Sequence, residues 1–264
     1  MNIYKKLPQF LCRFFLLLFL ITNFSYAEMD PFEMAEEKIE TLTSQITKSP
    51  NSANLYVERG DVYFLIHEFD SSVEDYTTAI DLDKSLDSAY FGRGLALGRQ
   101  GFISEGIKDL SHFIKNNSDS SLAYTKRGVR FLWLGDNDSA KNDFIRALSI
   151  NPNNAEAHDD LGVVLAQAGN YLEAINHFKL TVQIEPNYQK GYHNLAMAYY
   201  VTENDALALN SVNTSLHLKP TARNSLLLKS KILAALGRLK EAAELEEEAE
   251  FLPDGDWSEQ APVQ

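Results

Sequence analysis

A small residue recurs along this chain at a fixed interval, and this recurrence constrains the fold more than any other feature. The interval is 34 residues, and the positions that it connects are Gly60, Gly94, Gly128, Gly162, Ala196 and Ser230. A glycine inside a helix costs about 1 kcal/mol relative to alanine, so glycines kept in one phase need a compensating reason. The simplest reason is that two backbones approach each other closely at each of these positions.

Large residues keep step with this small column and predict a helix. Four residues before the small position stand Tyr56, Tyr90, Tyr124, His158, Tyr192 and Leu226, and three after it stand Tyr63, Leu97, Phe131, Leu165, Tyr199 and Leu233. Spacings of three and four residues place both sets on one stripe of a helix. A second column of small residues, which predicts a second helix in each repeat, contains Ser72, Gly106, Ala140, Ala174, Ala208 and Ala242.

Glycine and proline separate the predicted helices. The turn inside a repeat contains Gly101, Gly135, Gly169 and Gly237. Glycine is common just after the end of a helix because it adopts the left-handed backbone conformation found there. The second helices are followed by Pro152, Pro186 and Pro220. Because proline cannot continue a helix, these residues mark the ends of the repeats.

These columns resemble the tetratricopeptide repeat, a helix-turn-helix unit of 34 residues with the same order of aromatic, small and proline positions. The clearest unit runs from Ala155 to Pro186. The resemblance implies an all-α fold, a right-handed superhelical solenoid of tandem repeats. We expect residues 1–27 to be a signal peptide, 28–52 an N-terminal capping helix region, 53–252 six repeats and 253–264 a C-terminal tail. The six repeats begin near Ala53, Asp87, Ser121, Ala155, Gln189 and Arg223.

Some repeats depart from the pattern. Lys84 and Ser118 replace the proline in the first two repeats, Phe113 replaces a small residue in the second, and Glu203 replaces the turn glycine in the fifth. Glu246 stands in an apolar column of the last repeat. A charge there is compatible with a terminal helix that no further repeat covers, so the last helix is expected to cap the array.

Charged residues change together between repeats. Arg59, Arg93 and Arg127 are each followed sixteen residues later by Asp75, Asp109 and Asp143. In the fourth and fifth repeats, leucine replaces the arginine, and the aspartate is also replaced. This joint change predicts an ion pair between the two helices of a repeat. We interpret the pair as structural.

The first residues have the features of a secretory signal peptide. Three basic residues precede an apolar run, and small residues surround Ala27, where cleavage is expected. Even from Leu11 to Phe24 the run has 14 residues, fewer than the roughly 20 that a membrane-spanning helix needs. We therefore expect export to the periplasm or secretion, with retention of the peptide as a membrane anchor as the alternative. The only cysteine, Cys12, lies in this segment.

Composition and motifs argue against several classes of function. The net charge of −13 disfavours nucleic acid and anionic membrane surfaces, whose binding depends on basic residues. The histidines have no metal-binding helical spacing, and the sequence has no nucleophile elbow or phosphate-binding loop. We therefore predict no catalytic residue, no metal, no cofactor and no enzymatic activity.

The resemblance implies that the first helices line a concave groove that binds a peptide or a partner helix. The candidate groove residues are Asn54, Val57, Asp61, Phe64, Phe91, Leu95, Thr125, Val129, Leu132, Asp159, Val163, His193, Met197 and Tyr200, with Ser88, Leu122, Glu156 and Lys190 on the same wall. Chaperone-binding members of the family clamp a terminal carboxylate with Lys and Asn on this wall. Because Val57 and Asp61 stand in the first repeat, we do not expect that activity here.

We hypothesise an exported scaffold or adaptor that binds a partner protein in this groove. The apolar residues are expected to anchor the partner, and Asp61 and Asp159 are expected to attract its basic groups. The apolar residues could instead pack between neighbouring repeats. The alternative function is a structural or self-associating envelope protein, a homo-oligomer whose groove is partly filled by its own tail around Trp257.

Overall fold

The computed structural model describes residues 30–253, and this part of the chain contains thirteen helices and no strand. The helices are α2 (Pro31–Lys48), α3 (Ala53–Leu65), α4 (Phe69–Leu82), α5 (Asp87–Arg99), α6 (Ile103–Asn116), α7 (Ser121–Trp133), α8 (Asn137–Ile150), α9 (Ala155–Gln167), α10 (Tyr171–Ile184), α11 (Gln189–Val201), α12 (Asp205–Leu218), α13 (Arg223–Ala235) and α14 (Leu239–Glu250). The expected signal peptide and Trp257 of the expected tail lie outside the described residues.

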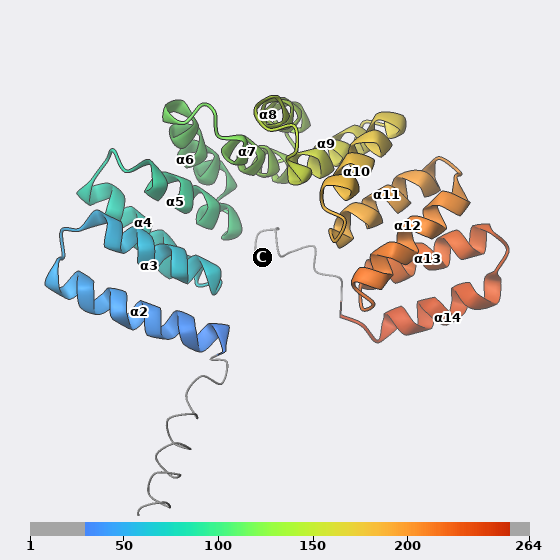
Figure 1. The fold of residues 1–264 in the computed structure, drawn as a ribbon, viewed down its shortest axis with the longest axis horizontal. Helices are drawn as coiled ribbons and strands as arrows, with labels where there is room; N and C mark the ends of the chain where they lie inside the picture. The colour runs from blue at the N-terminus through green and yellow to red at the C-terminus, as the bar shows by residue number, and fades with distance from the viewer. Residues whose placement is uncertain (1–29, 254–264) are drawn as a thin grey trace, which may run out of the picture.

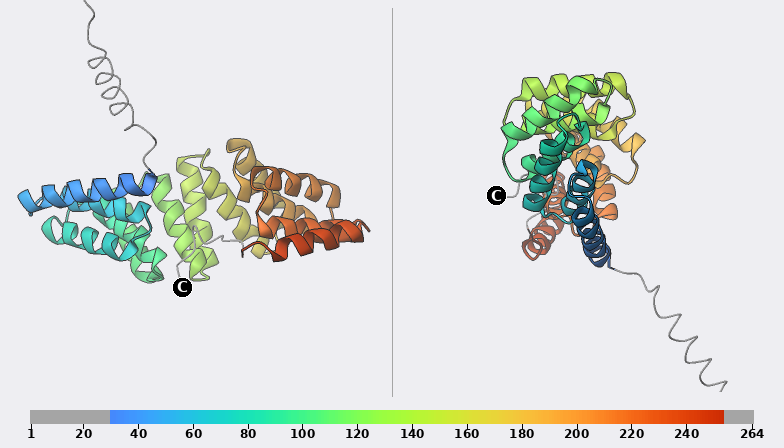
Figure 2. Two further views of the ribbon diagram at one scale, coloured as in Figure 1. Left: turned by 90° about the horizontal axis from the view of Figure 1, so that it is seen from below. Right: turned by 90° about the vertical axis from the view of Figure 1, so that its left-hand side faces the viewer.

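The helices pack as six consecutive pairs, from α3 with α4 to α13 with α14, and α2 packs on the first pair. Each first helix also contacts the first helix of the next pair, whereas no second helix between α4 and α14 contacts the next second helix. The first helices therefore lie on the inner side of a curved array, which follows an arch from α2 to α14 (Figure 1). The other views show α2 and α14 at the two ends of the curved stack (Figure 2). The all-α solenoid predicted from the repeat is confirmed.

The small column lies where the two helices of a pair approach most closely. A Cβ atom added at Gly128 would lie 2.6 Å from the ring of Phe144, and one at Gly162 would lie 2.5 Å from the ring of Phe178. In the fifth repeat, the corresponding residue of the second helix is the smaller Val212, and alanine replaces glycine in the first helix. The predicted close approach of two backbones is found in the second repeat, where a Cβ atom added at Gly94 would lie 3.0 Å from the carbonyl oxygen of Gly106; in the third and fourth repeats the glycine makes room for an aromatic ring instead.

The repeats that depart from the sequence pattern keep its geometry. The second helices α4, α6, α8, α10 and α12 end at 34-residue steps, with or without a following proline. Glu203 has a φ of 57° and His67 has a φ of 64°, so both adopt the left-handed conformation of Gly101 and its equivalents. The strain of a side chain in this conformation, about 1 to 2 kcal/mol, is therefore accepted in two of the turns.

The predicted ion pairs between helices are present in the first three repeats. The Nη2 atom of Arg59 lies 2.7 Å from Oδ1 of Asp75, and the Nε atom of Arg93 lies 2.6 Å from Oδ2 of Asp109. The Nη1 atom of Arg59 also donates to Oγ1 of Thr43, at 2.9 Å, on the preceding second helix. Because α2 precedes the first repeat, Arg59 joins that repeat to α2, and Nη1 of Arg93 joins the second repeat to the first through Oγ1 of Thr77 at 3.3 Å.

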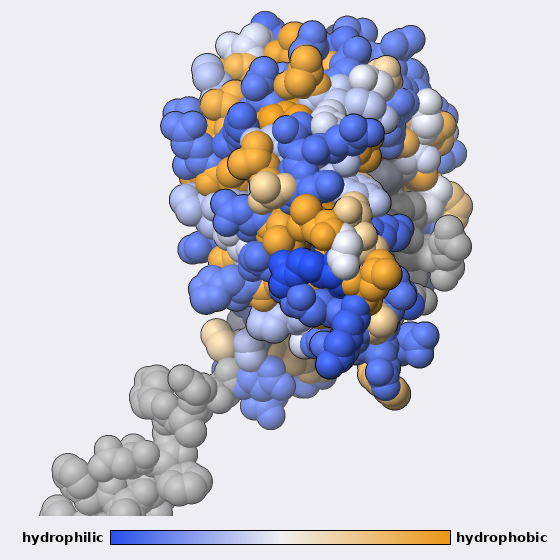
Figure 3. All heavy atoms as spheres, turned by 90° about the vertical axis from the view of Figure 1, so that its right-hand side faces the viewer, coloured by the Kyte–Doolittle hydropathy of each residue, from blue (hydrophilic) through white to orange (hydrophobic). Residues whose placement is uncertain are grey.

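The two ends of the array differ in how they are covered. On α2, Leu42 and Ile46 are buried, and this helix packs on α3. On α14, Glu246 is exposed and accepts a hydrogen bond from the hydroxyl of Ser230 at 3.0 Å. The face seen in Figure 3, from the α13 and α14 side, mixes hydrophilic and hydrophobic residues.

Candidate functional site

The concave wall, defined as the inward surface of α3, α5, α7, α9, α11 and α13, is the candidate site. The candidate residues divide into two groups by exposure. The exposed or half-exposed residues are Asn54, Asp61, Phe64, Phe91, Leu95, Leu132, Val163, Met197 and Tyr200. The buried residues are Val57, Thr125, Val129, Asp159 and His193. The first group forms most of the surface that a partner could contact.

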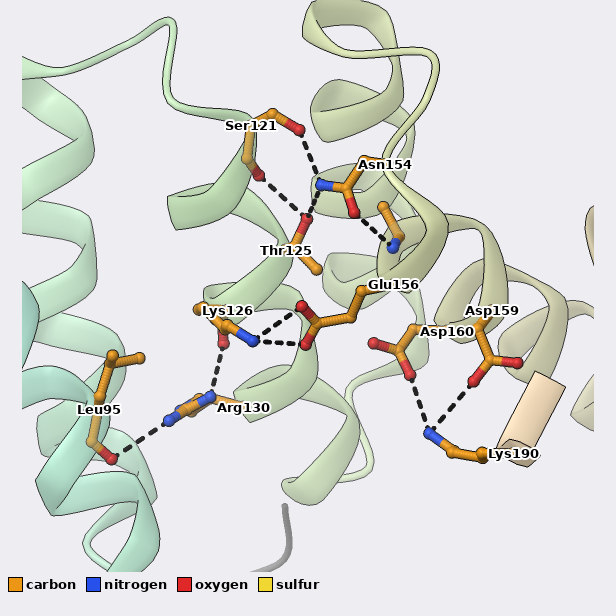
Figure 4. A network of polar contacts seen from close by, with 11 residues as sticks. Leu95, Ser121, Thr125, Lys126, Arg130, Asn154, Glu156, Asp159, Asp160 and Lys190 are labelled. Carbon is orange, nitrogen blue, oxygen red and sulfur yellow. Dashed lines mark hydrogen bonds and ion pairs between the residues drawn. The ribbon is translucent and has the colours of Figure 1, made fainter. Parts of the chain in front are cut away.

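The buried residues Thr125, Asp159 and His193 belong to one column, which lies in the seam between neighbouring first helices. The hydroxyl of Thr125 donates to the carbonyl of Ser121 at 3.0 Å and accepts from Nδ2 of Asn154 at 3.0 Å (Figure 4). His193 lies 3.0 Å from Oγ of Ser225 on α13, and its burial lowers its pKa to about 4. These side chains contact the next repeat instead of facing the groove.

Asp159 takes part in a buried charged cluster between α9 and α11. Its Oδ1 atom accepts from Nδ2 of Asn194 at 2.9 Å, and its Oδ2 atom lies 3.2 Å from Nζ of Lys190. The same ammonium lies 3.6 Å from Oδ1 of Asp160 (Figure 4). Burial raises the pKa of Asp160 above its usual value, and the nearby charge of Lys190 partly offsets this rise. Since Asp159 is fully buried and paired with Lys190, it is not available to attract basic groups of a partner.

A second ion pair joins α7 and α9 on the same wall. Nζ of Lys126 lies 2.6 Å from Oε1 and 2.8 Å from Oε2 of Glu156 (Figure 4). Both side chains are about one quarter exposed. The middle of the concave wall therefore carries charged side chains, which are largely paired with one another within the solenoid.

Arg130 is a wall residue that the sequence reasoning missed. It is 4% exposed, and its guanidinium donates to the backbone carbonyls of Lys126, at 3.3 Å, and Leu95, at 3.2 Å. Its burial lowers its pKa to about 10. Gly98 makes room for it, because a Cβ atom there would lie 2.7 Å from Nε. The available signal was an arginine in a column otherwise occupied by valine, alanine and isoleucine.

A hollow of about 400 Å³ opens between α3 and α5 at the N-terminal part of the wall. Its lining residues are Val57, Asp61, Phe64, Leu65, Tyr76, Ser88, Phe91, Gly92 and Leu95. Five of these nine are candidate groove residues, and Ser88 was expected on the same wall. The structure therefore brings the inward positions of the first two repeats together around one cavity.

Neither a metal cluster nor a membrane-spanning helix is found in the part of the chain that the structure describes. Within residues 30–253, no three His, Cys, Asp or Glu side chains converge as a set of metal ligands. No helix in the same range combines the length and the apolar composition that are needed to cross a membrane.

Comparisons with known proteins agree with the repeat. A family model described as TPR repeat matches residues 60–101, and one described as Tetratricopeptide repeat matches residues 125–188. Tetratricopeptide repeat protein 13 of Homo sapiens is 29% identical over 103 residues, which are 39% of this chain and 12% of that protein. The FAM10 family protein At4g22670 of Arabidopsis thaliana is 33% identical over 75 residues, or 28% of this chain and 17% of that protein. The matched region therefore spans less than a fifth of either relative.

Solved structures share the fold at low sequence identity. PilF of Pseudomonas aeruginosa has a TM-score of 0.67 and 14% identity, covering 74% of this chain and 89% of that one. A tetratricopeptide repeat protein of Parabacteroides merdae has a TM-score of 0.66 and 19% identity, covering 83% and 86%. YrrB, described as a TPR protein with an unusual peptide-binding site, has a TM-score of 0.55 and 22% identity, covering 71% and 97%.

Repeat spacing, paired helices and family models thus agree. Proteins with this repeat bind protein or peptide partners and are generally scaffolds without enzymatic activity. This chain is therefore a tetratricopeptide-repeat protein, with family models that match residues 60–101 and 125–188.

Proposed function

We propose that this protein is an exported scaffold that binds a peptide or helical segment of a partner protein on its concave wall. The observation that carries the proposal is a row of incompletely buried apolar residues on consecutive first helices. Leu132 on α7, Val163 on α9 and Tyr200 on α11 all pack at the edge of the same buried core cluster. Met197, beside Tyr200 on α11, is 40% exposed.

The row has the properties of an anchoring surface. Its residues belong to rigid first helices, so little conformational entropy is lost when a partner binds. Tyrosine, here Tyr200, is among the residue types that dominate binding energy, and the apolar neighbours of such a residue help to exclude water from the contact. YrrB has the same fold, and its description as a peptide-binding protein supports a peptide as the ligand here.

Export rests on the N-terminal residues alone. Lys5, Lys6 and Arg13 before the apolar run, and the small residues around Ala27, support a cleaved signal peptide. Mass spectrometry of the protein from its native cells tests this part directly. A mature N-terminus at residue 28 in an envelope or secreted fraction supports export, whereas an intact N-terminus in a soluble intracellular fraction contradicts it.

Binding by the wall is tested by capture and titration with matched variants. The partner is first identified by cross-linking to the wild-type protein in its native compartment. Met197→Asp and Leu132→Asp are then compared with Leu172→Asp, which introduces the same charge at a 77% exposed leucine on the second helix α10. We expect the two wall variants to weaken binding at least tenfold while Leu172→Asp binds normally. Equal binding by Met197→Asp and Leu172→Asp would reject the concave wall.

A second candidate function is self-association without a separate ligand. It is favoured by apolar side chains that remain exposed at the C-terminal end of the array, where Leu236 is 43%, Leu239 is 68% and Phe251 is 82% exposed. Light scattering across a hundredfold range of protein concentration distinguishes the two functions. A concentration-dependent mass that Leu239→Asp abolishes supports self-association, and a constant monomer mass excludes it.

A further inference from the structure

The hollow between α3 and α5 has walls that suit one long side chain. Its volume of about 400 Å³ lies within the range of roughly 300–1,000 Å³ that is typical of ligand pockets. Val57, Phe64 and Leu95 supply apolar walls, and the ring of Tyr76 comes from the second helix α4. Gly92 allows Tyr76 to lie there, because a Cβ atom at Gly92 would be 2.3 Å from Cζ of that ring.

One carboxylate in the lining of this hollow has no cationic partner. Oδ1 of Asp61 accepts a hydrogen bond of 2.6 Å from the hydroxyl of Tyr76, and no ion pair involves Asp61 anywhere in residues 30–253. Loss of hydration raises the pKa of Asp61, the Tyr76 hydrogen bond lowers it, and the negative charge of nearby Glu58 raises it further. The site therefore presents two neighbouring acidic groups beside an apolar cavity.

The five buried aspartates in residues 30–253 each have a cationic partner. Asp75, Asp109 and Asp143 pair with arginines, and Asp159 and Asp160 share Lys190. Asp61 is exposed at the hollow and has no cationic partner in residues 30–253, so by charge complementarity a positive group of a partner would suit this position.

We propose that this hollow is a binding subsite for a basic side chain of the partner, with its aliphatic stem against the apolar walls and its cationic end at Asp61. This inference rests on the proposed function of the concave wall and specifies one contact within it. Arginine and lysine suit such a site because their stems bury against apolar surface while their charged ends stay at the rim. Arginine fits best, since its guanidinium can donate two hydrogen bonds to one carboxylate.

The probe for this subsite is butylguanidinium, compared with its uncharged isostere butylurea. Binding is followed by nuclear magnetic resonance through the methyl signals of Val57 and Leu95. We expect butylguanidinium to shift both signals and to bind roughly three- to tenfold more tightly than butylurea, as a partly exposed charge-assisted contact allows. In Asp61→Asn this preference disappears, because the amide still accepts from Tyr76 but carries no charge.

Two further variants complete the test. Asp119→Asn removes the same charge from an exposed turn and is expected to leave the preference unchanged, which controls for the overall negative charge of the protein. Ser88→Trp fills the mouth of the hollow from an exposed position and is expected to abolish binding of both probes. Equal affinity of Asp61→Asn and the wild type for butylguanidinium, or shifts confined to other methyl signals, would overturn the subsite.

The experiments distinguish failure of the subsite from failure of the proposed function. Suppose that the partner loses affinity for Met197→Asp while butylguanidinium binds Asp61→Asn as tightly as it binds the wild type. The proposed function then stands and the subsite is rejected. If butylguanidinium binds at Asp61 but the partner binds Met197→Asp normally, the scaffold function of the wall is rejected instead.

Discussion

Arg127 and Asp143 face each other across the two helices of the third repeat with two atoms each. The Nη2–Oδ1 distance is 2.7 Å and the Nε–Oδ2 distance is 2.8 Å, so the pair is bidentate. The remaining Nη1 atom of Arg127 donates to Oγ of Ser111 at 3.0 Å on the preceding second helix. In the fourth repeat, Leu161 and His177 occupy the positions of the arginine and the aspartate.

Replacing Arg127 alone should therefore be costly. Arg127→Leu leaves Asp143, whose side chain is 8% exposed, as an unpaired charge, and we expect a loss of about 2 kcal/mol in the free energy of unfolding. The double variant Arg127→Leu with Asp143→His copies the fourth repeat and should recover most of that loss. Urea unfolding of the two single variants and the double variant measures the coupling, and additive effects would contradict the prediction.

Replacing a glycine of the small column by alanine should destabilise the protein, although alanine has the higher helix propensity. Gly162→Ala places a methyl group 2.5 Å from the ring of Phe178, so we expect a loss of about 1 to 3 kcal/mol from overpacking. Gly60→Ala is the milder comparison, because its methyl group would lie 3.0 Å from the ring of Tyr76. Thermal unfolding monitored by circular dichroism should rank Gly162→Ala as the less stable variant. A gain in stability at Gly162 would show that propensity dominates there.

Strain in the fifth turn can be removed. Glu203 has a φ of 57° and is exposed, so Glu203→Gly relieves the left-handed conformation without removing a packed side chain. We expect a stabilisation of about 1 kcal/mol, after allowance for the greater freedom of glycine in the unfolded chain. Gly169→Ala is the converse experiment at φ 80° and should destabilise the fourth repeat. A melting temperature unchanged by either variant would contradict the strain argument.

The fourth repeat should be sensitive to acid. His158 and His177 approach with their Nδ1 atoms 2.9 Å apart, and His158 Nε2 contacts the carbonyl of Pro152 at 3.0 Å. Burial lowers the pKa of both histidines, and mutual repulsion lowers that of His177 further. Because the unfolded chain binds these protons more readily, the stabilising contribution of the pair is present above about pH 6.5 and is lost as the pH falls below it.

His158→Tyr isolates this effect from other titrating groups. In the first repeat, the hydroxyl of Tyr56 donates to the carbonyl of Pro50 at 3.2 Å, so tyrosine at position 158 can keep the equivalent contact. We expect wild type and variant to differ little at pH 7.5, and the variant to become relatively more stable as the pH falls from 6.5 to 5. If the difference in the free energy of unfolding between variant and wild type stays constant from pH 6.5 to pH 5, the histidine pair is excluded as the cause of the acid sensitivity.

The geometry of the repeat could be predicted from the sequence because the residues that determine it recur in several repeats. The close approach at Gly128 and Gly162 and the pairing of Arg127 with Asp143 could be predicted from columns that vary together. Residues that recur at this interval indicate contacts within one repeat or between equivalent positions of adjacent repeats.

The exposure of the wall could not be predicted in the same way. Val57, Thr125 and Asp159 occupy equivalent inward positions, but how far each is covered depends on the side chains of the next first helix. The pairing of Lys190 with Asp159 left no repeated pattern, because lysine and aspartate each occur once in these two columns of the six repeats. A single occurrence leaves no periodic signal, and this limit also applies to Arg130.

The seam between α9 and α11 has a mechanical consequence for the whole molecule. Repeats contact only their immediate neighbours, so α13 and α14 are attached to the rest of the array through α11 and α12. A small rotation at the Asp159–Lys190 seam is therefore amplified by the lever arm beyond it. The contacts at this joint, which include the Asp159–Lys190 pair and the packing of α10 on α11, therefore help to set the position of the C-terminal helices relative to the N-terminal ones.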